Sequence, residues 1–197
     1  MADSEGLRER KKQRTRQTIA SAAARLFEKR GFENVRMIDI AAAADVSEQT
    51  LYNYFPSKEH LIFDRDQEFE QQIIDIVIGR KTSIADAVRT GVLDFLEQAS
   101  RSLGKTSGIP ESVATGPALR RVWIEMNARH ADHLAEHLVA GGMHKASAKL
   151  LSRSIVAMFA VTLEEIGEAA IAGKSRSVLL RELRPILESA AKQFDVY

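Results

Sequence analysis

Apolar residues recur every three to four positions along almost the whole chain, and this spacing restricts the fold more than any other feature. It places the apolar side chains on one face of an α-helix, whereas a half-buried strand needs alternation at every second residue, which is missing throughout. Glycine and proline are scarce, with 11 and 4 among 197 residues, and they cluster where helices should end. The sequence therefore predicts an all-α protein of about nine helices.

Stop signals and caps divide this pattern into helices. Gly31 and Gly173 follow predicted helices as left-handed caps, and Pro56 ends another because the residue before proline disfavours helical backbone. Pro185 lies inside the last predicted helix, where we expect a late start or a kink. Residues 104–117 form the loosest segment, with a possible helical turn at 111–115. The predicted helices cover 10–30, 37–44, 48–55, 58–80, 84–103, 118–139, 145–172 and 176–194.

Positive charge is concentrated near the N-terminus. Residues 7–30 hold nine Lys or Arg against Glu9 and Glu28, although the net charge of the whole chain is only +1. A basic segment on a nearly neutral protein is typical of an arm that contacts nucleic acid. A solvated, partly disordered tail is the alternative, and the charge alone does not separate the two.

Several classes of protein are disfavoured by the composition. The chain has no cysteine, so disulfides and thiolate chemistry are excluded. No apolar signal-peptide core and no run of apolar residues long enough for a membrane span is present, so we expect a cytoplasmic protein without membrane contact. We find no nucleophile elbow, no phosphate loop and no pair of carboxylates beside a base, so the sequence predicts neither an enzyme nor a cofactor.

The segment "DVSEQTLYNYFPSKEHL", Asp45 to Leu61, begins with a tight turn that joins the short predicted helix at 37–44 to the short predicted helix at 48–55. Two short helices joined in this way, with a preceding helix across them, form a helix-turn-helix. The apolar positions Ile40, Ala41, Val46 and Leu51 have the spacing of a small core that fixes the angle between the helices. Phe55 is predicted to join that core, whereas the other aromatic residues and their polar neighbours face outward.

This region closely resembles the DNA-binding domain of the tetracycline-repressor (TetR) family of bacterial regulators. The similarity extends from Ile19 to Ile62 and is carried by "LFEKRGF", "IDIAAAADVS" and "TLYNYFPSKEHL". The remaining two thirds of the chain resemble the family only in helical layout and length. The resemblance implies an N-terminal arm and helix-turn-helix domain at 1–56, followed by a helical ligand-binding and dimerisation domain at 57–197.

Carried over by position, the resemblance implies a set of DNA contacts. The recognition helix would contribute most of them, Lys58 would reach a backbone phosphate at a helix start, and the second helix would begin with two contacting or capping residues. For the aromatic residues the alternative is packing against the first helix. The predicted DNA-binding residues are Arg36, Met37, Gln49, Thr50, Tyr52, Tyr54 and Lys58.

Two positions depart from the family pattern. Arg36 stands where a threonine or serine cap is usual, which loses the cap but offers a charge-assisted phosphate contact. Asp45 replaces the usual turn glycine, which strains the turn slightly because aspartate tolerates left-handed backbone only moderately.

The last two predicted helices carry more apolar surface than one face can bury within a chain. A single recognition helix reads few base pairs, so such domains act in symmetric pairs. The resemblance implies a homodimer in which two helices from each chain form a four-helix bundle. Filling of a monomeric core is the alternative. The predicted interface residues are Ile155, Phe159, Leu163, Leu183, Ile186 and Leu187.

The middle helices would enclose a cavity for a small hydrophobic ligand in this family. Large apolar residues at helical spacing also occur in an ordinary core, and that alternative stays open. The predicted pocket residues are Phe95, Trp123, Met126, His130 and Met158.

Three histidines, His130, His133 and His137, share one face of the predicted 118–139 helix. Neutral imidazoles at this spacing can bind zinc or nickel, but one helix rarely supplies a complete site and no cysteine is available. We therefore predict no metal site and keep a metal-responsive regulator as the alternative.

The sequence thus predicts a DNA-binding transcriptional regulator: a homodimeric repressor that a small apolar ligand releases from a palindromic operator. A regulator of the same fold without any small-molecule effector is the second alternative. The ligand, the operator, the regulated genes and the choice between repression and activation lie beyond the sequence.

Overall fold

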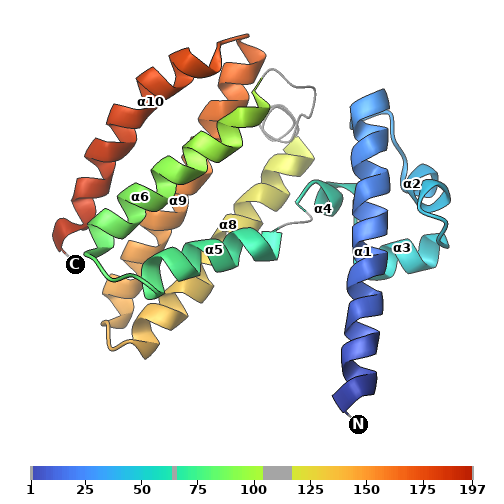
Figure 1. Ribbon diagram of the computed structural model, residues 1–197, viewed down its shortest axis with the longest axis horizontal. Helices are drawn as coiled ribbons and strands as arrows, with labels where there is room; N and C mark the ends of the chain where they lie inside the picture. Colours follow the sequence, from blue (N-terminus) through green and yellow to red (C-terminus); the bar gives the residue numbers. More distant parts are fainter. Residues whose placement is uncertain (1, 64–65, 104–116, 197) are drawn as a thin grey trace. The chain divides into compact units, whose positions relative to one another are not determined.

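The computed structural model describes residues 2–63, 66–103 and 117–196 (Figure 1). Every regular element in these ranges is a helix, so the predicted all-α fold is confirmed. The elements are α1 (Ala2–Arg30), α2 (Met37–Ala43), α3 (Glu48–Tyr54), α4 (Lys58–Ile62), α5 (Asp66–Ile78), α6 (Ile84–Ala99), α8 (Pro117–Ala140), α9 (Lys145–Ile171) and α10 (Arg176–Ala191), with 3-10 turns at Ser100–Ser102 and Lys192–Val196. The helical turn predicted at 111–115 lies outside the described residues.

Two compact units make up the chain, Met1–Asp64 and Arg65–Tyr197. The sequence analysis placed a boundary between residues 56 and 57, which assigned α4 to the larger domain. In the structure α4 belongs to the first unit, because it packs against α1 and Leu61 lies in the core that α1, α2 and α3 share.

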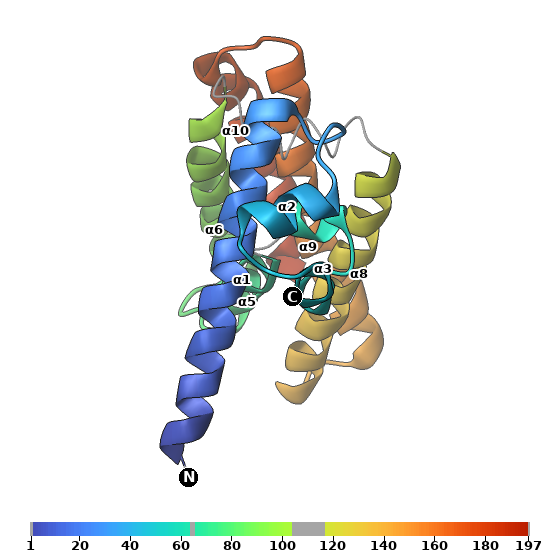
Figure 2. The same cartoon turned by 90° about the vertical axis from the view of Figure 1, so that its right-hand side faces the viewer.

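The first unit is built around one small apolar core. Helix α1 crosses α2 and α4, while its N-terminal part extends well past α2 and α3 (Figure 2). The predicted core positions Ile40, Ala41 and Leu51 are buried, and Val46 packs against them half-buried. Phe55 is fully buried, as predicted. This core holds α2 and α3 at a fixed angle, which is the condition for a helix-turn-helix.

The predicted helix over residues 58–80 is wrong as a single element. Helix α4 ends at Ile62, and the backbone at Phe63 (φ −99°, ψ 32°) leaves helical geometry, which interrupts the hydrogen-bond ladder. The next helix, α5, covers only Asp66–Ile78. The apolar spacing continues across the break, so periodicity alone did not reveal it.

In its described residues, the second unit packs the five helices α5, α6, α8, α9 and α10 around a larger core. Helix α8 lies against α9 and α5, and α6 packs against α5, α9 and α10 (Figure 1). The approach of α5 to α6 is close at Gly91, where a Cβ atom would lie 2.6 Å from Ile76 Cδ1. Helix α10 begins at Arg176 with Pro185 inside it, so the last helix has no late start.

None of the helices in the described ranges is long and apolar enough to cross a membrane.

Candidate functional site

The start of α3 is shaped by a tight turn and a serine cap. Asp45 adopts left-handed backbone with φ 53°, the conformation that the usual glycine would take without strain. Ser47 Oγ then accepts a hydrogen bond from the Thr50 amide at 3.0 Å and lies 2.7 Å from Thr50 Oγ1. The cap satisfies a free amide of the first turn, so α3 begins at a defined residue.

The outward face of α3 is polar and exposed. Gln49 Nε2 donates to Asn53 Oδ1 at 3.1 Å, which orders both amides along the surface. Tyr52 is 46% exposed, whereas Tyr54 is half-buried and packs against the core of the first unit. The structure therefore separates the two tyrosines: Tyr52 has a free ring face, and Tyr54 has less surface available for DNA.

Arg16 of α1 holds the end of α3. Its guanidinium lies 4.4 Å from the centre of the Phe55 ring and donates to the Tyr54 carbonyl at 3.4 Å. A cation over an aromatic face, combined with a carbonyl at a helix C-terminus, fixes α3 against α1. The sequence analysis counted Arg16 only as part of the basic segment.

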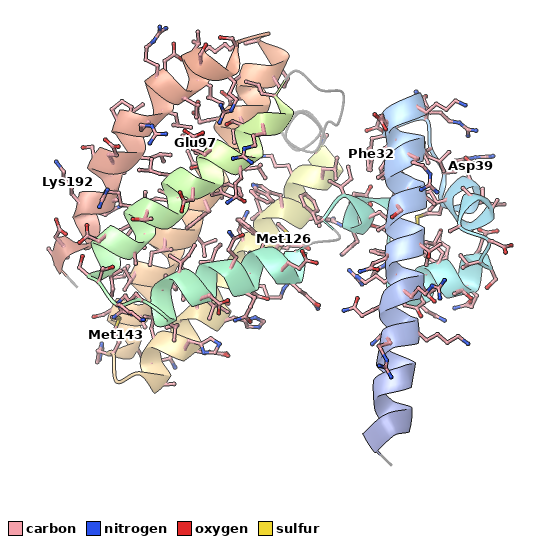
Figure 3. The ribbon with its side chains drawn as sticks, in the orientation of Figure 1. Phe32, Asp39, Glu97, Met126, Met143 and Lys192 are labelled. Carbon is pink, nitrogen blue, oxygen red and sulfur yellow. The ribbon has the colours of Figure 1, made fainter. Side chains whose placement is uncertain are left out.

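Arg36 and Asp39 form a closed pair at the start of α2. The carboxylate of Asp39, which is labelled in Figure 3, accepts from the Arg36 amide at 3.1 Å and from the Arg36 Nε at 3.3 Å, so it satisfies the backbone N–H of the residue that precedes α2. The hydrogen bonds from Arg36 hold the pKa of Asp39 below its usual range. The Arg36 side chain stays exposed, while Met37 is half-buried against the core.

Lys58 is engaged within the first unit. Its Nζ donates to the Phe32 carbonyl at 2.8 Å and lies 4.1 Å from the centre of the Phe32 ring. This contact ties α4 to the loop after α1. The predicted phosphate contact by Lys58 stays a prediction, and the same ammonium has donors left for it.

Basic side chains continue along the extended part of α1, where Arg10, Lys11, Lys12 and Arg14 are all exposed. The helix runs from Ala2, earlier than the predicted start at residue 10. The segment is thus helical in the structure, which favours a positively charged arm over a disordered tail.

The N-terminal region matches a family model. Residues 19–64 match the model of bacterial regulatory proteins of the tetR family. The transcriptional repressor KstR of Mycobacterium tuberculosis is 48% identical over 94 residues, 47% of this chain and 39% of the repressor. KstR of Mycolicibacterium smegmatis is 45% identical over 69 residues, 34% of this chain and 31% of the repressor. These matches span about a third of the length of the curated relatives.

A solved structure is similar to this chain over most of its length. The TetR family repressor AlkX from Dietzia sp. has a TM-score of 0.56 and 25% identity, covering 88% of this chain and 97% of AlkX. Residues 19–64 therefore carry a TetR-family domain, and the described chain shares its fold with a TetR-family repressor. Members of this family are transcription regulators and not enzymes, as the sequence predicted.

The predicted pocket residues are buried or half-buried, and of the five only Met158 borders the groove between α9 and α10. Trp123, Met126 and His130 are almost completely buried, and Phe95 packs half-buried against the core. Met158 borders a groove of about 610 Å³, but that groove lies between α9 and α10. A ligand role for these residues stays a prediction.

The histidine stripe faces carboxylates of α5. His130 Nε2 lies 2.5 Å from Asp66 Oδ1, and His133 Nδ1 lies 2.5 Å from Glu70 Oε1. Arg129 also pairs with Asp66. Within the described ranges no group of three or more His, Asp or Glu side chains is placed to hold a metal ion, so the geometry lends no support to a metal-responsive regulator.

The predicted dimer residues divide into two groups. Ile155, Phe159, Leu183 and Leu187 are at most 5% exposed and belong to the core of a single chain, although Leu183 and Leu187 also line the groove between α9 and α10. Ile186 is 60% exposed, and Leu163 is half-buried. The groove between α9 and α10 is bordered by Ala157, Val161, Glu165, Glu182, Ile186 and Ala190.

Three residues beside this core had no role in the sequence analysis: Asp66, Glu70 and Asn127. The four-residue spacing of the two carboxylates on α5 matches the three-residue spacing of His130 and His133 on α8, and this match was available in the sequence. That the two helices pack together was not, because contacts distant in sequence leave no periodic signal. Asn127 follows Trp123 by one turn.

Proposed function

We propose that this TetR-family chain is a homodimeric repressor that binds a palindromic operator and leaves it when a small apolar ligand binds. The observation that carries the proposal is the exposed polar face of α3, held on an apolar core within the segment that matches the family. Gln49, Thr50 and Tyr52 supply hydrogen-bond donors, acceptors and a flat ring on this face.

DNA binding would combine two kinds of contact. The face of α3 has the dimensions to enter a major groove and read base edges. The exposed cations of α1 between Arg10 and Arg14 would contact phosphates, which adds affinity without sequence preference. The helical arm and the recognition helix therefore have separable roles.

A footprint on the DNA flanking the gene, followed by affinity measurements on the protected site, tests this binding. Tyr52→Phe removes one exposed hydroxyl and should weaken specific binding by up to about tenfold, since a hydrogen bond contributes about 0.5–1.5 kcal/mol. Arg14→Ala should weaken specific and unspecific binding alike and reduce the salt dependence. Gln72→Ala, an exposed change on α5, is the control. No protected site, or equal effects of all three changes, contradicts the proposal.

The groove between α9 and α10 supports the homodimer. Val161 and Ile186 are large apolar residues exposed beside it, and Ala157 and Ala190 leave room for a second helix. A pair of helices related to its copy by a two-fold axis would cover these residues and form a four-helix bundle. The same axis would place two recognition helices on successive half-sites.

Light scattering on two matched variants tests the dimer. Ile186→Glu places a charge in the proposed interface and should shift the protein to a monomer at micromolar concentration. Ile124→Glu changes a residue of similar exposure, 58%, on α8 and should leave the dimer intact. A dimer that survives Ile186→Glu, or dissociates equally with Ile124→Glu, rules out this interface.

Release by a ligand requires that the ligand favours a state with low DNA affinity. The core of the second unit, with its aromatic residues Phe69, Phe95 and Phe159, supports an apolar effector. The similar repressor AlkX is implicated in biodegradation of n-alkanes, which agrees with an apolar compound. A panel of hydrophobic compounds added to the footprinted complex should include one that removes protection; a complex unaffected by all of them favours the regulator without an effector.

A further inference from the structure

The exposed charges of α9 are separated by sign along the helix. Its first half carries exposed cations, and its second half carries exposed carboxylates. In order, these residues are Lys145, Lys149 and Arg153, then Glu165 and Glu168. Within the described part of the chain, none of them forms an ion pair. The charges are therefore available to a second molecule.

This order of charges is unfavourable within a single chain. The start of a helix carries partial positive charge and its end partial negative charge, so carboxylates favour the start and cations favour the end. Helix α9 has the reverse order, with no acidic residue in its first turn and no basic residue in its last. Lys149 and Arg153 are also four residues apart, a spacing at which like charges repel. A sequence that breaks local rules in this way is expected to be compensated by another interaction.

An apolar strip runs between these charges on the outward face of α9. Its members lie within about 40° of one direction, since successive residues of a helix are 100° apart. Leu150, Val161 and Ile171 are large and 47–64% exposed, whereas Ala146 and Ala157 are small and exposed. At Ala157 and Val161 the strip borders the groove between α9 and α10. Exposed apolar residues that adjoin one another mark an interaction surface.

An antiparallel copy of α9 places opposite charges next to each other. A two-fold axis that crosses the helix beside residues 158 and 159 brings Lys149 opposite the partner's Glu168. The same axis brings Arg153 opposite the partner's Glu165. A parallel copy would instead place cations beside cations and carboxylates beside carboxylates. The charge order therefore selects the antiparallel arrangement.

The apolar strip fits the same register. Val161 lies opposite the partner's Ala157, and Ile171 lies opposite the partner's Ala146, so a large side chain meets a small one each time. A shift by four residues that brings Arg153 opposite the partner's Val161 would bury a cation against an apolar side chain, which is costly. Charge and size thus agree on one register.

We propose that α9 of a second copy of this chain docks antiparallel on α9, in the register set by the pairs Lys149–Glu168 and Arg153–Glu165. The inference rests on the proposed homodimeric repressor and names the contacts that join its two copies. Each pair occurs twice in the dimer because the arrangement is symmetric. A related chain with another order of charges would bring like charges together, so the pairs also select the partner.

Reversal of the charges in the full chain tests the pairing. Lys149→Glu combined with Arg153→Glu puts four carboxylates at each end of the interface and should weaken dimerisation about 100-fold in analytical ultracentrifugation, because every ion pair becomes a like-charge contact. Glu165→Lys combined with Glu168→Lys should weaken it similarly. A mixture of the two double variants should form a heterodimer, since opposite charges meet again at both ends. Double variants that dimerise as tightly as the unchanged protein overturn the proposal.

A control separates pairing from net charge. Arg120→Glu combined with Arg121→Glu changes two exposed cations on α8 and alters the net charge by the same amount. This variant should keep its dimer affinity within about twofold, because exposed charges far from the interface are screened. A loss equal to that of the α9 variants overturns the proposal. So does a mixture that fails to dimerise although circular dichroism shows both double variants folded.

Disulfide formation measures the register directly, because the chain has no cysteine of its own. A mixture of Ala146→Cys and Ile171→Cys proteins should cross-link on mild oxidation, since a disulfide forms when the Cα atoms lie within about 7 Å. Neither variant alone should cross-link, because its two cysteines would lie about 37 Å apart along an antiparallel pair. Cross-linking of Ala146→Cys with itself indicates parallel helices and overturns the proposal, as does a mixture that does not cross-link. This test holds even if a charge variant does not fold.

Failure of this inference is distinguishable from failure of the proposed function. A dimer that binds its operator but is insensitive to both charge reversals keeps the repressor proposal and overturns the register. A chain that is monomeric in light scattering and binds its operator as a monomer contradicts the homodimer itself, and the register with it.

Discussion

The two units of the chain place their polar groups differently. In the described part of the first unit, every buried residue is hydrophobic, and the polar side chains of α2 and α3 are at the surface. The second unit buries Ser100, His130, Ser152 and Thr162. A unit that recognises a partner from outside needs only an apolar core under a polar face, whereas a unit that bound a ligand inside, as proposed for the second unit, would have to bury polar atoms.

The buried hydroxyls of the second unit show which of these groups is unusual. Thr162 Oγ1 donates to the Met158 carbonyl at 2.7 Å, and Ser152 Oγ donates to the Lys149 carbonyl at 3.3 Å. Both are satisfied by their own helix, which is a common solution for hydroxyls within helices. His130 differs, because its ring bonds to a carboxylate of another helix, α5.

The largest expected effect on stability comes from a substitution in the core of the second unit. Phe159→Ala removes a ring that contacts both Phe69 and Phe95, and should lower the free energy of unfolding by about 3–5 kcal/mol. Denaturant unfolding followed by circular dichroism measures it. Val161→Ala, two residues along α9 and 47% exposed, should change the free energy by less than about 0.5 kcal/mol. If both variants lost the same free energy of unfolding, the outer face of α9 would be as tightly packed as its inner face.

A smaller effect concerns the surface of the first unit. Ser47→Ala leaves the Thr50 amide without its cap and should cost about 1 kcal/mol of stability. Because the cap also orients the first turn of α3, operator affinity should fall in the same variant. Ser57→Ala is the matched control, since the Ser57 hydroxyl bonds to the side chains of Glu59 and His60 but accepts no backbone amide of α4. Similar losses for both serines would contradict the assigned role of Ser47.

The smallest effect is the pH dependence of the Arg36–Asp39 pair. The pKa of Asp39 is lowered in the folded protein, chiefly by the side-chain hydrogen bond from Arg36. Its contribution to stability is therefore present above the unfolded pKa of about 3.9 and is lost as the pH falls through the folded pKa. Unfolding midpoints of the unchanged protein and of Asp39→Asn should differ at pH 7 and converge near pH 2. A difference that is independent of pH would contradict the pairing.

Prediction from sequence succeeded best where residues close along the chain decide the structure. The helix-turn-helix, the buried Phe55, the Ser47 cap and the left-handed Asp45 all depend on neighbours within a few positions. It failed at Phe63, where an uninterrupted apolar spacing hid the end of α4. Capping by Asp39 in place of residue 36 was also missed, although an acidic residue at the third position of a helix is a known signal.

The candidate site in the second unit shows the limit more clearly. His130 was singled out for the pattern on its own helix, which suggested a metal or a pocket wall. Its partner Asp66 lies 64 residues earlier in the chain and came into view only when α5 packed against α8. The predicted interface residues could not be separated from core residues either. The apolar spacing on α9 and α10 does not show which side of each helix packs against the chain's own core.

By itself the sequence determined the all-α class, the helix-turn-helix and the outward position of Tyr52, because local spacing and capping decide them. The tertiary structure alone decided which carboxylates meet the histidines and which apolar residues of α9 and α10 stay exposed. The physical reason is that burial and charge pairing depend on contacts between distant segments, and the periodicity of one helix carries no information about its neighbours.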